Sequence, residues 1–294
     1  MSLRLEALQI ARLAPNLLHE SSDLVRAFII SQMNEDGGFK NREGASDIYY
    51  TVFGIDCLVA LRAELPLHTT GPYLERFGEG DGLDLAHLAS LARCMASLRG
   101  GPVLDARRSE LLLRLASFRS LDGGFHNHAG SPGGTVYACF LALGAYQDLG
   151  GELPDPQGVL DCVRGLETAD GAYSNDRAVR IGSTPATAAA VGILRGLGAG
   201  QRPEVGAWLE ARCHHEGGFF ATPGAPVPDL LSTAVALHAL ASLEHPIDRL
   251  REPCLDFIDS LWTNRGSFHG SWADDQLDAE YTYYGLLALG HLSV

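Results

Sequence analysis

The residues best suited to chemistry lie near the C-terminus, where two carboxylates stand one residue apart among aromatic rings. Asp278 and Glu280 are followed directly by Tyr281, and two more tyrosines follow at positions 283 and 284. A carboxyl group that is removed from water keeps its proton to a higher pH, because burial disfavours the charged form. Such a group can act as a general acid, and neighbouring rings can stabilise positive charge. Asp278 and Glu280 are therefore the first catalytic candidates.

A third candidate acid, Asp229, occupies a similar place earlier in the chain. Asp47, Asp229 and Asp278 each stand four residues before a threonine, just after a loop. An aspartate in such a place can accept hydrogen bonds from free amide groups at the start of a helix. Helix capping is the structural interpretation for all three, and Asp229 is kept as a further catalytic candidate.

An internal repeat must position these acids. A glycine turn followed by an aromatic residue occurs five times, at residues 36–39, 122–125, 170–173, 216–219 and 265–268. Each turn precedes an apolar run that we align on a threonine, and the aligned threonines are Thr51, Thr135, Thr187, Thr233 and Thr282. The first two threonines are 84 residues apart, nearly two periods, so a degenerate sixth unit is expected at residues 83–89.

The repeat predicts an all-α fold. Segments such as 22–30, 110–118 and 253–261 alternate charged and apolar residues at helical spacing, which is typical of half-exposed outer helices. The threonine-aligned runs carry almost no charge, as expected of inner helices. About six such hairpins must stack to bury their faces and can close into an α6/α6 toroid, a single domain over residues 1–294. All inner helices then begin at one end, at the mouth of the central cavity, which is the expected site.

Composition excludes several classes of function. The 294 residues are 46% hydrophobic and 20% charged, with a net charge of −14. This charge argues against binding to nucleic acid or to anionic lipid. Six scattered cysteines without a Cys-x-x-Cys pair favour a reducing, cytoplasmic location. We find neither a leader pattern nor 18 uninterrupted apolar residues, so no membrane span is expected.

The repeat resembles those of the protein prenyltransferase β-subunits and the squalene (terpene) cyclases. Residues 32–39, Gln-Met-Asn-Glu-Asp-Gly-Gly-Phe, are similar to the glutamine-and-glycine signature of that family, and the turn recurs in five copies across nearly the whole chain. The resemblance implies the α6/α6 toroid, with a central apolar funnel that holds an isoprenoid chain.

The resemblance also implies where zinc would bind. In the protein prenyltransferases an Asp-x-Cys element and a histidine of the next unit hold the metal. Here the element reads Asp229, Leu230, Leu231, and Tyr281 stands at the histidine position. The segment 217–229 also lacks the basic residues that usually hold the diphosphate. The chain is therefore interpreted as a divergent member in which zinc is not expected, and no residue is assigned to a metal.

The class II terpene cyclases instead use a protonating Asp-x-Asp-Asp element. Residues 278–282 resemble it, with Glu280 at the place of the central acid, but they are one acid short. The resemblance implies protonation of an alkene by Glu280. Asp274, Asp275 and Asp278 also spell an aspartate-rich magnesium–diphosphate motif at the junction of loop and helix, so magnesium stays open as a cofactor.

Residues expected to contact a substrate are aromatic or basic. Aromatic candidates near the starts of inner helices are Tyr49, Tyr50, Phe220, Tyr281 and Trp272. The basic candidates for an anionic head group are Arg177 and Arg180, in the loop before Thr187. The histidine clusters at 126–128 and 214–215 are interpreted as polar loop edges, and His238, within an apolar run, as a hydrogen-bonded core histidine.

Three functions remain open. The first is a prenyltransferase- or terpene-cyclase-like protein that binds an isoprenoid or another apolar small molecule without the usual zinc site. The second is a non-catalytic toroid that binds a lipid or a partner protein. The third is an α6/α6 carbohydrate-active enzyme, which requires two opposed acids in a polar groove lined by tryptophan.

Overall fold

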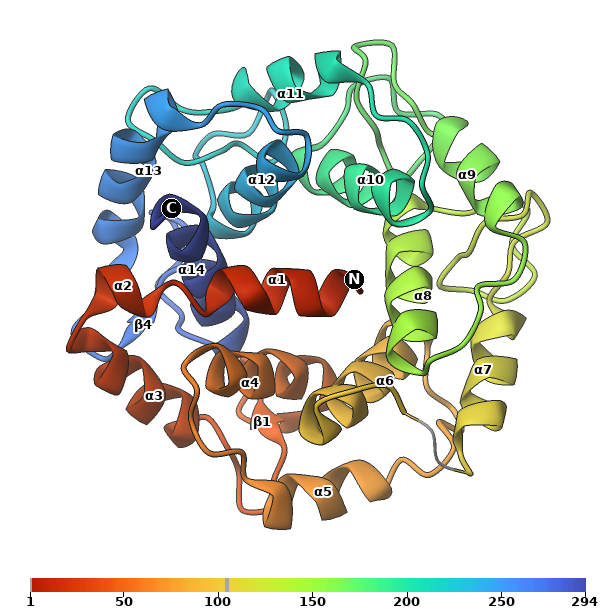
Figure 1. The fold of residues 1–294 in the computed structure, drawn as a ribbon, viewed down its shortest axis with the longest axis horizontal. Coiled ribbons are helices and arrows are strands. Elements are labelled where there is room, and N and C mark those ends of the chain that lie inside the picture. Colours follow the sequence, from red (N-terminus) through yellow and green to blue (C-terminus); the bar gives the residue numbers. More distant parts are fainter. Residues whose placement is uncertain (1, 104–105) are drawn as a thin grey trace.

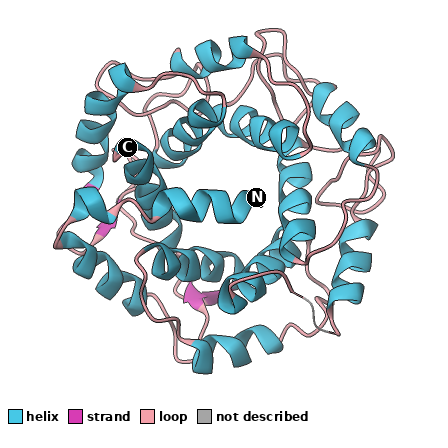
Figure 2. Ribbon diagram, in the orientation of Figure 1, coloured by secondary structure: helices cyan, strands magenta, loops and turns pink. Residues whose placement is uncertain are grey.

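The computed structural model describes residues 2–103 and 106–294, whose helices form two concentric rings (Figures 1 and 2). The inner ring consists of α4 (Ile48–Ala60), α6 (Leu85–Arg99), α8 (Val136–Asp148), α10 (Thr184–Gly196), α12 (Leu230–Ser242) and α14 (Ala279–Leu292). The outer ring consists of α3 (Ser21–Ser31), α5 (Leu67–Glu75), α7 (Arg108–Ser117), α9 (Pro156–Arg164), α11 (Pro203–Glu210) and α13 (Asp248–Leu261). The predicted α6/α6 toroid is confirmed, and α6 is the degenerate sixth unit.

Each inner helix begins at a polar side chain that accepts a hydrogen bond from an amide of the first turn. The six capping residues are Asp47, Asp84, Thr135, Ser183, Asp229 and Asp278. Neighbouring starts lie side by side: the amide of Leu230 donates to the carbonyl of Gly270, and His87 Nε2 lies 3.9 Å from Asp47 Oδ1. All inner helices therefore begin at the same end of the ring, the mouth.

The glycine turns hold each outer helix against the next one. Gly37, Gly217 and Gly266 have positive φ angles of 89°, 90° and 84°. A Cβ on Gly217 would lie 1.8 Å from the carbonyl oxygen of Pro253 in α13, so only glycine allows this approach. A Cβ on Gly266 would lie 2.2 Å from the carbonyl oxygen of Leu24 in α3, which shows that the last turn closes the ring against the first outer helix.

Three of the five aligned threonines accept a hydrogen bond from the aromatic residue of the turn. The amide of Phe39 donates to Thr51 Oγ1 at 3.0 Å, and equivalent bonds reach Thr187 and Thr233. In the second unit the amide of Phe125 donates instead to Cys139 Sγ at 3.3 Å. The alignment of Thr135 is therefore wrong by four residues, because a thiol takes the place of the hydroxyl and Thr135 serves as the cap.

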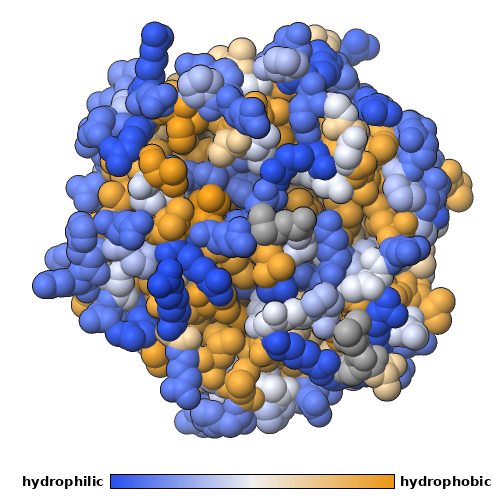
Figure 3. Space-filling view, in the orientation of Figure 1, coloured by the Kyte–Doolittle hydropathy of each residue, from blue (hydrophilic) through white to orange (hydrophobic). Residues whose placement is uncertain are grey.

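The N-terminal helix crosses the ring at the end opposite the mouth. Helix α1 (Leu3–Ala11), followed by the short α2 (Pro15–Leu18), contacts α14, α4 and α8 (Figure 1). Figure 3 shows this face, where hydrophobic side chains are interspersed with hydrophilic ones and the rim is mainly hydrophilic. The sequence did not predict this arrangement.

Strands are confined to two short ribbons in the described ranges. Strand β1 (Phe39–Lys40) pairs with β2 (Ser46–Asp47), and β3 (Trp262–Thr263) pairs with β4 (Ser267–Phe268). Across residues 2–103 and 106–294 no helix has the length and apolarity needed to cross a bilayer.

Candidate active site

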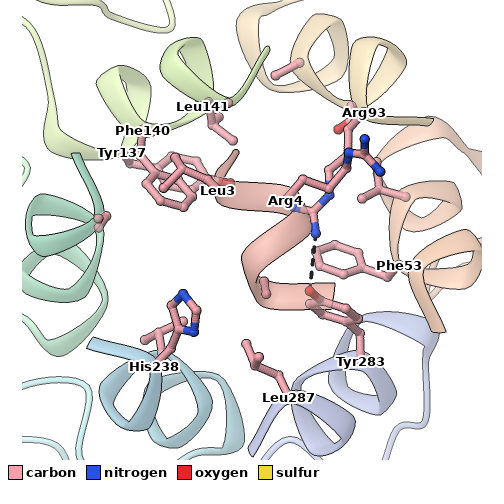
Figure 4. A pocket seen from close by; sticks show the side chains of 18 of the residues that line it. Leu3, Arg4, Phe53, Arg93, Tyr137, Phe140, Leu141, His238, Tyr283 and Leu287 are labelled. Atoms are coloured by element: carbon pink, nitrogen blue, oxygen red, sulfur yellow. Dashed lines mark hydrogen bonds between the residues drawn. The ribbon is translucent and has the colours of Figure 1, made fainter. Parts of the chain in front are cut away.

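A cavity of about 310 Å³ occupies the centre of the inner ring (Figure 4). Its walls follow the helical period, because most of the inner-helix residues two, five or six, and nine positions beyond the cap face inward. The second of these layers includes Val52, Phe53, Ala89, Ser90, Phe140, Leu141, Ala188, Ala189, Val235, Tyr283 and Tyr284. Leu3, Arg4 and Ala7 of α1 form the floor. The lining is mostly apolar and aromatic, as in sites for small apolar molecules.

Glu280 lies beside the mouth of this cavity, in contact with one residue of its lining but outside the lining itself. The residues two positions beyond the six caps are Tyr49, Ala86, Tyr137, Pro185, Leu231 and Glu280. Tyr49, Tyr137 and Leu231 line the cavity, and the hydroxyl of Tyr49 donates to Glu280 Oε1 at 2.7 Å. Glu280 is therefore the one carboxylic acid among these six side chains, and it adjoins the cavity through Tyr49.

Burial changes the acidity of Glu280. The loss of water contacts, together with the nearby Asp278 carboxylate, raises the pKa of Glu280 to about 7, although the Tyr49 bond acts in the opposite direction. Its Oε2 makes no hydrogen bond to another described residue and is free to carry the proton. A carboxyl group with a pKa near the working pH is suited to general acid catalysis.

The other two candidate acids are occupied by structural bonds. Asp278 is 1% exposed, caps α14 through the amide of Tyr281 at 2.8 Å, and accepts from Arg42 Nε at 2.9 Å. Asp229 accepts from the amide of Ser232 at 2.7 Å and from its hydroxyl at 2.8 Å. Burial raises the pKa of Asp229. The structure thus supports the capping interpretation for both and leaves Glu280 as the acid beside the cavity.

The predicted aromatic contacts divide into two groups. Tyr49 lines the cavity, whereas Tyr50 and Tyr281 lie beside it at the mouth, and the guanidinium of Arg42 lies 5.3 Å from the centre of the Tyr281 ring. Phe220 and Trp272 lie at the outer edge, where both rings pack against His214.

The predicted basic residues do not reach the cavity. Arg177 is exposed and pairs with Asp122 at 2.6 Å, and Arg180 is also exposed. Both lie in the loop before α10, outside the cavity lining.

Several lining residues were not singled out from the sequence. Tyr137 and Phe53 are examples, and counting from the caps would have found both. Polar groups also lie at the α1 end: Arg93 Nε donates to Asp56 Oδ2 at 2.7 Å, and Arg4 Nε donates to Asp148 Oδ1 at 2.8 Å. Within each pair the charges of the arginine and the aspartate cancel at the floor of an apolar cavity.

Comparison with known proteins identifies the fold family. Residues 5–87 and 162–293 match the model of the prenyltransferase alpha-alpha toroid domain. The chain belongs to this family. No curated protein sequence matches the chain.

Solved structures of toroid proteins are similar to the chain over almost its whole length. The apo type II terpene cyclase MstE from Scytonema is 16% identical with a TM-score of 0.65, covering 95% of this chain and 97% of its own. A variant of MstE in complex with geranylgeranyl dihydroxybenzoate gives a TM-score of 0.63 at 16% identity and the same coverage. Protein geranylgeranyltransferase-I from Candida albicans, complexed with GGPP, gives 0.53 at 15% identity, covering 98% of this chain and 82% of its own. At these identities the likeness shows a shared toroid fold.

The residues of this toroid do not fit the zinc site of the protein prenyltransferases. Leu231 presents an apolar side chain to the cavity, and Tyr281 packs against Arg42, so both positions lack a nitrogen or sulfur ligand. In the magnesium motif, Arg42 already binds Asp274 and Asp278. Among the described residues, a cluster of side chains that could hold a metal ion occurs at the surface and consists of His214, His215 and Glu216.

Proposed function

We propose that this toroid binds a short isoprenoid chain in its central cavity and converts it to a cyclic isomer by proton transfer from Glu280. The observation that carries the proposal is the Tyr49–Glu280 pair at the mouth of an apolar cavity, with the pKa of Glu280 at about 7. The ligands in the structures of the two similar proteins, geranylgeranyl dihydroxybenzoate and GGPP, support an isoprenoid as the occupant.

The chemistry follows from the position of the acid. Tyr49 holds Oε1 of protonated Glu280, and the proton on Oε2 passes to a carbon of an alkene near the mouth. The electrons of the next double bond then form a carbon–carbon bond to the cation. The rings of Tyr49, Phe53 and Tyr284 lie where they can stabilise this charge, and the apolar lining limits attack by water.

The dimensions favour a small and uncharged substrate. A volume of about 310 Å³ lies at the lower end of the range of about 300–1,000 Å³ that is usual for sites of small organic molecules. The basic side chains near the mouth, Arg42 and His87, already contact the carboxylates of Asp278 and Asp84. A prenyl alcohol or a similar neutral chain therefore suits the site better than a diphosphate.

The test is incubation of the purified protein with geraniol, farnesol and geranylgeraniol, followed by analysis of the products by mass spectrometry. A cyclic isomer with the mass of the substrate is expected from the wild type but not from Glu280→Gln. The matched control is Glu43→Gln, a change at an exposed loop position that should leave turnover intact. Binding without conversion would favour the non-catalytic lipid-binding toroid. The absence of both binding and conversion would contradict the proposal.

The carbohydrate alternative has less support from the geometry. Trp208, Trp262 and Trp272 all lie outside the lining of the central cavity. The acids Asp56 and Asp148 near the floor are both paired with arginines. A polar trough with two free opposed carboxyl groups is therefore not found in the described residues.

A further inference from the structure

A histidine pair connects the cavity wall to the neighbouring helix. His238 of α12 lines the cavity, and its ring points into the open space in Figure 4. Its Nδ1 lies 3.0 Å from Nε2 of His291 in α14. The hydrogen bond expected for His238 from the sequence is therefore present, but the residue faces the cavity instead of being enclosed in the core.

The pair is electrically neutral. Burial lowers the pKa of His238, and burial together with His238 lowers the pKa of His291 to about 3. Two neutral imidazoles at this distance share one proton between the facing nitrogens. When Nδ1 of His238 carries that proton, its Nε2 exposes a lone pair. Among the described residues none forms a hydrogen bond with this Nε2, so the lone pair is available to a molecule in the cavity.

His238 lines the cavity at a greater depth than the mouth, where Glu280 lies beside the lining residue Tyr49. Glu280 is two positions beyond the cap of α14, and His238 is nine positions beyond the cap of the adjacent α12. Seven residues along a helix correspond to about 10 Å. A chain with one end beside Glu280 therefore extends to the level of His238. The other side chain at this level that can carry charge into the cavity is Arg93, which is paired with Asp56.

We propose that His238, supported by His291, is the base that ends the reaction by removing a proton from the cyclised cation. This inference rests on the proposed function. The electron pair of the broken C–H bond becomes the new C=C bond, and the proton goes to Nε2 of His238. The proton on Nδ1 shifts towards Nε2 of His291, which spreads the charge over both rings. One proton enters at Glu280 and one leaves at His238, so the product is an isomer and no further reactant is needed.

A weak base is sufficient for this step. A carbocation is a very strong acid, so even an imidazole with a lowered pKa removes its proton. The same weak basicity keeps His238 neutral at the start of each cycle, because a protonated imidazole at this place would repel the cation. The two ends of the reaction are thus assigned to groups with opposite tasks, an acid at the mouth and a base near the floor.

The test compares substrate consumption with product identity in His238→Asn, using the prenyl alcohols named above. We expect the variant to consume substrate, because Glu280 is intact, while formation of the wild-type product falls about 100-fold. Other alkene isomers and alcohols formed by addition of water should replace that product. His291→Gln should change the products in the same direction. His245→Asn is the matched control, because His245 pairs with Glu210 away from the cavity, and its products should stay those of the wild type.

The outcomes separate the inference from the function on which it rests. Consumption by His238→Asn with the unchanged wild-type product overturns the role of His238 and leaves Glu280 catalysis standing. A wild type that consumes none of the three alcohols overturns the proposed function and the inference together. If His238→Asn does not fold, His238→Gln is measured instead, since its longer amide remains within reach of His291.

Discussion

Replacement of Glu280 by glutamine is predicted to increase stability at high pH while it removes activity. The carboxyl group is buried beside the rings of Tyr49 and Tyr284, and this burial raises its pKa from an ordinary 4.5 to about 7. An ionised carboxylate in this place is unfavourable for the folded state. Glutamine keeps a carbonyl oxygen that can accept from Tyr49 but never carries the charge.

The size and sign of the effect follow from proton linkage. Below pH 4.5 the carboxyl group is protonated in both the folded and the unfolded state, so it has no effect on stability. Between pH 4.5 and about 7 only the unfolded state releases the proton, and stability falls as pH rises. Above pH 7 the cost is complete and amounts to about 3 kcal/mol. Glu280→Gln avoids this cost, so its advantage over the wild type should grow from about zero at pH 4 to about 3 kcal/mol at pH 8.

The assay is urea denaturation of the wild type, Glu280→Gln and Glu43→Gln at pH values from 4 to 8. Glu43 is exposed, so its variant should follow the wild type across this range and control for the general loss of one acid. A difference between Glu280→Gln and the wild type that does not depend on pH would refute the assignment of a raised pKa. A variant that becomes less stable as pH rises would contradict the sign of the argument.

Three further predictions concern the ring and its floor. Arg4→Ala leaves the buried carboxylate of Asp148 unpaired and should lower the free energy of unfolding by about 3–5 kcal/mol in denaturant titrations, and a loss below about 1 kcal/mol would contradict a buried pair. Gly217→Ala forces a Cβ into the carbonyl of Pro253 and should cost more than about 2 kcal/mol in thermal unfolding. Gly224→Ala, with open space around it, is the matched control and should melt like the wild type. Treatment with a chelator should leave turnover of prenyl alcohols unchanged, because the ligand positions of the zinc enzymes hold leucine and tyrosine here, and loss of turnover would contradict this interpretation.

The ring could be predicted from the sequence because its signals are local and repeated. Glycine turns and helix caps depend on residues within a few positions of one another, and Asp229 and Asp278 serve as caps as expected. Glu280 and Tyr49 were both identified as candidates, and the structure brings their side chains into direct contact.

The remaining site residues depend on register or on long-range contacts. Tyr137 was missed because Thr135 was aligned as a core threonine, whereas Cys139 has that role. With the correct register, Tyr137 takes the same position relative to its cap as Tyr49 and Glu280. The placement of Arg4 could not be predicted, because its partner Asp148 is 144 residues away and nothing in the repeat describes the N-terminal helix.

Loop residues were the least predictable. Trp272 is close to the start of α14 in the sequence, but its indole N–H donates to Ser260 at 2.8 Å on the outer helix α13 and holds the ring outside the cavity. Arg177 lies over the turn of the preceding unit, where Asp122 attracts it. In both cases a single side-chain bond decides where the side chain points, and helical periodicity carries no information on such bonds.

The most direct test of proton-initiated cyclisation at Glu280 is turnover of the prenyl alcohols in heavy water. Because Glu280 exchanges its acidic proton with solvent between cycles, each product molecule should carry one carbon-bound deuterium, seen as a mass increase of one unit. This label should be absent from incubations with Glu280→Gln. A cyclic product without deuterium, or the same labelled product from Glu280→Gln, would contradict the account.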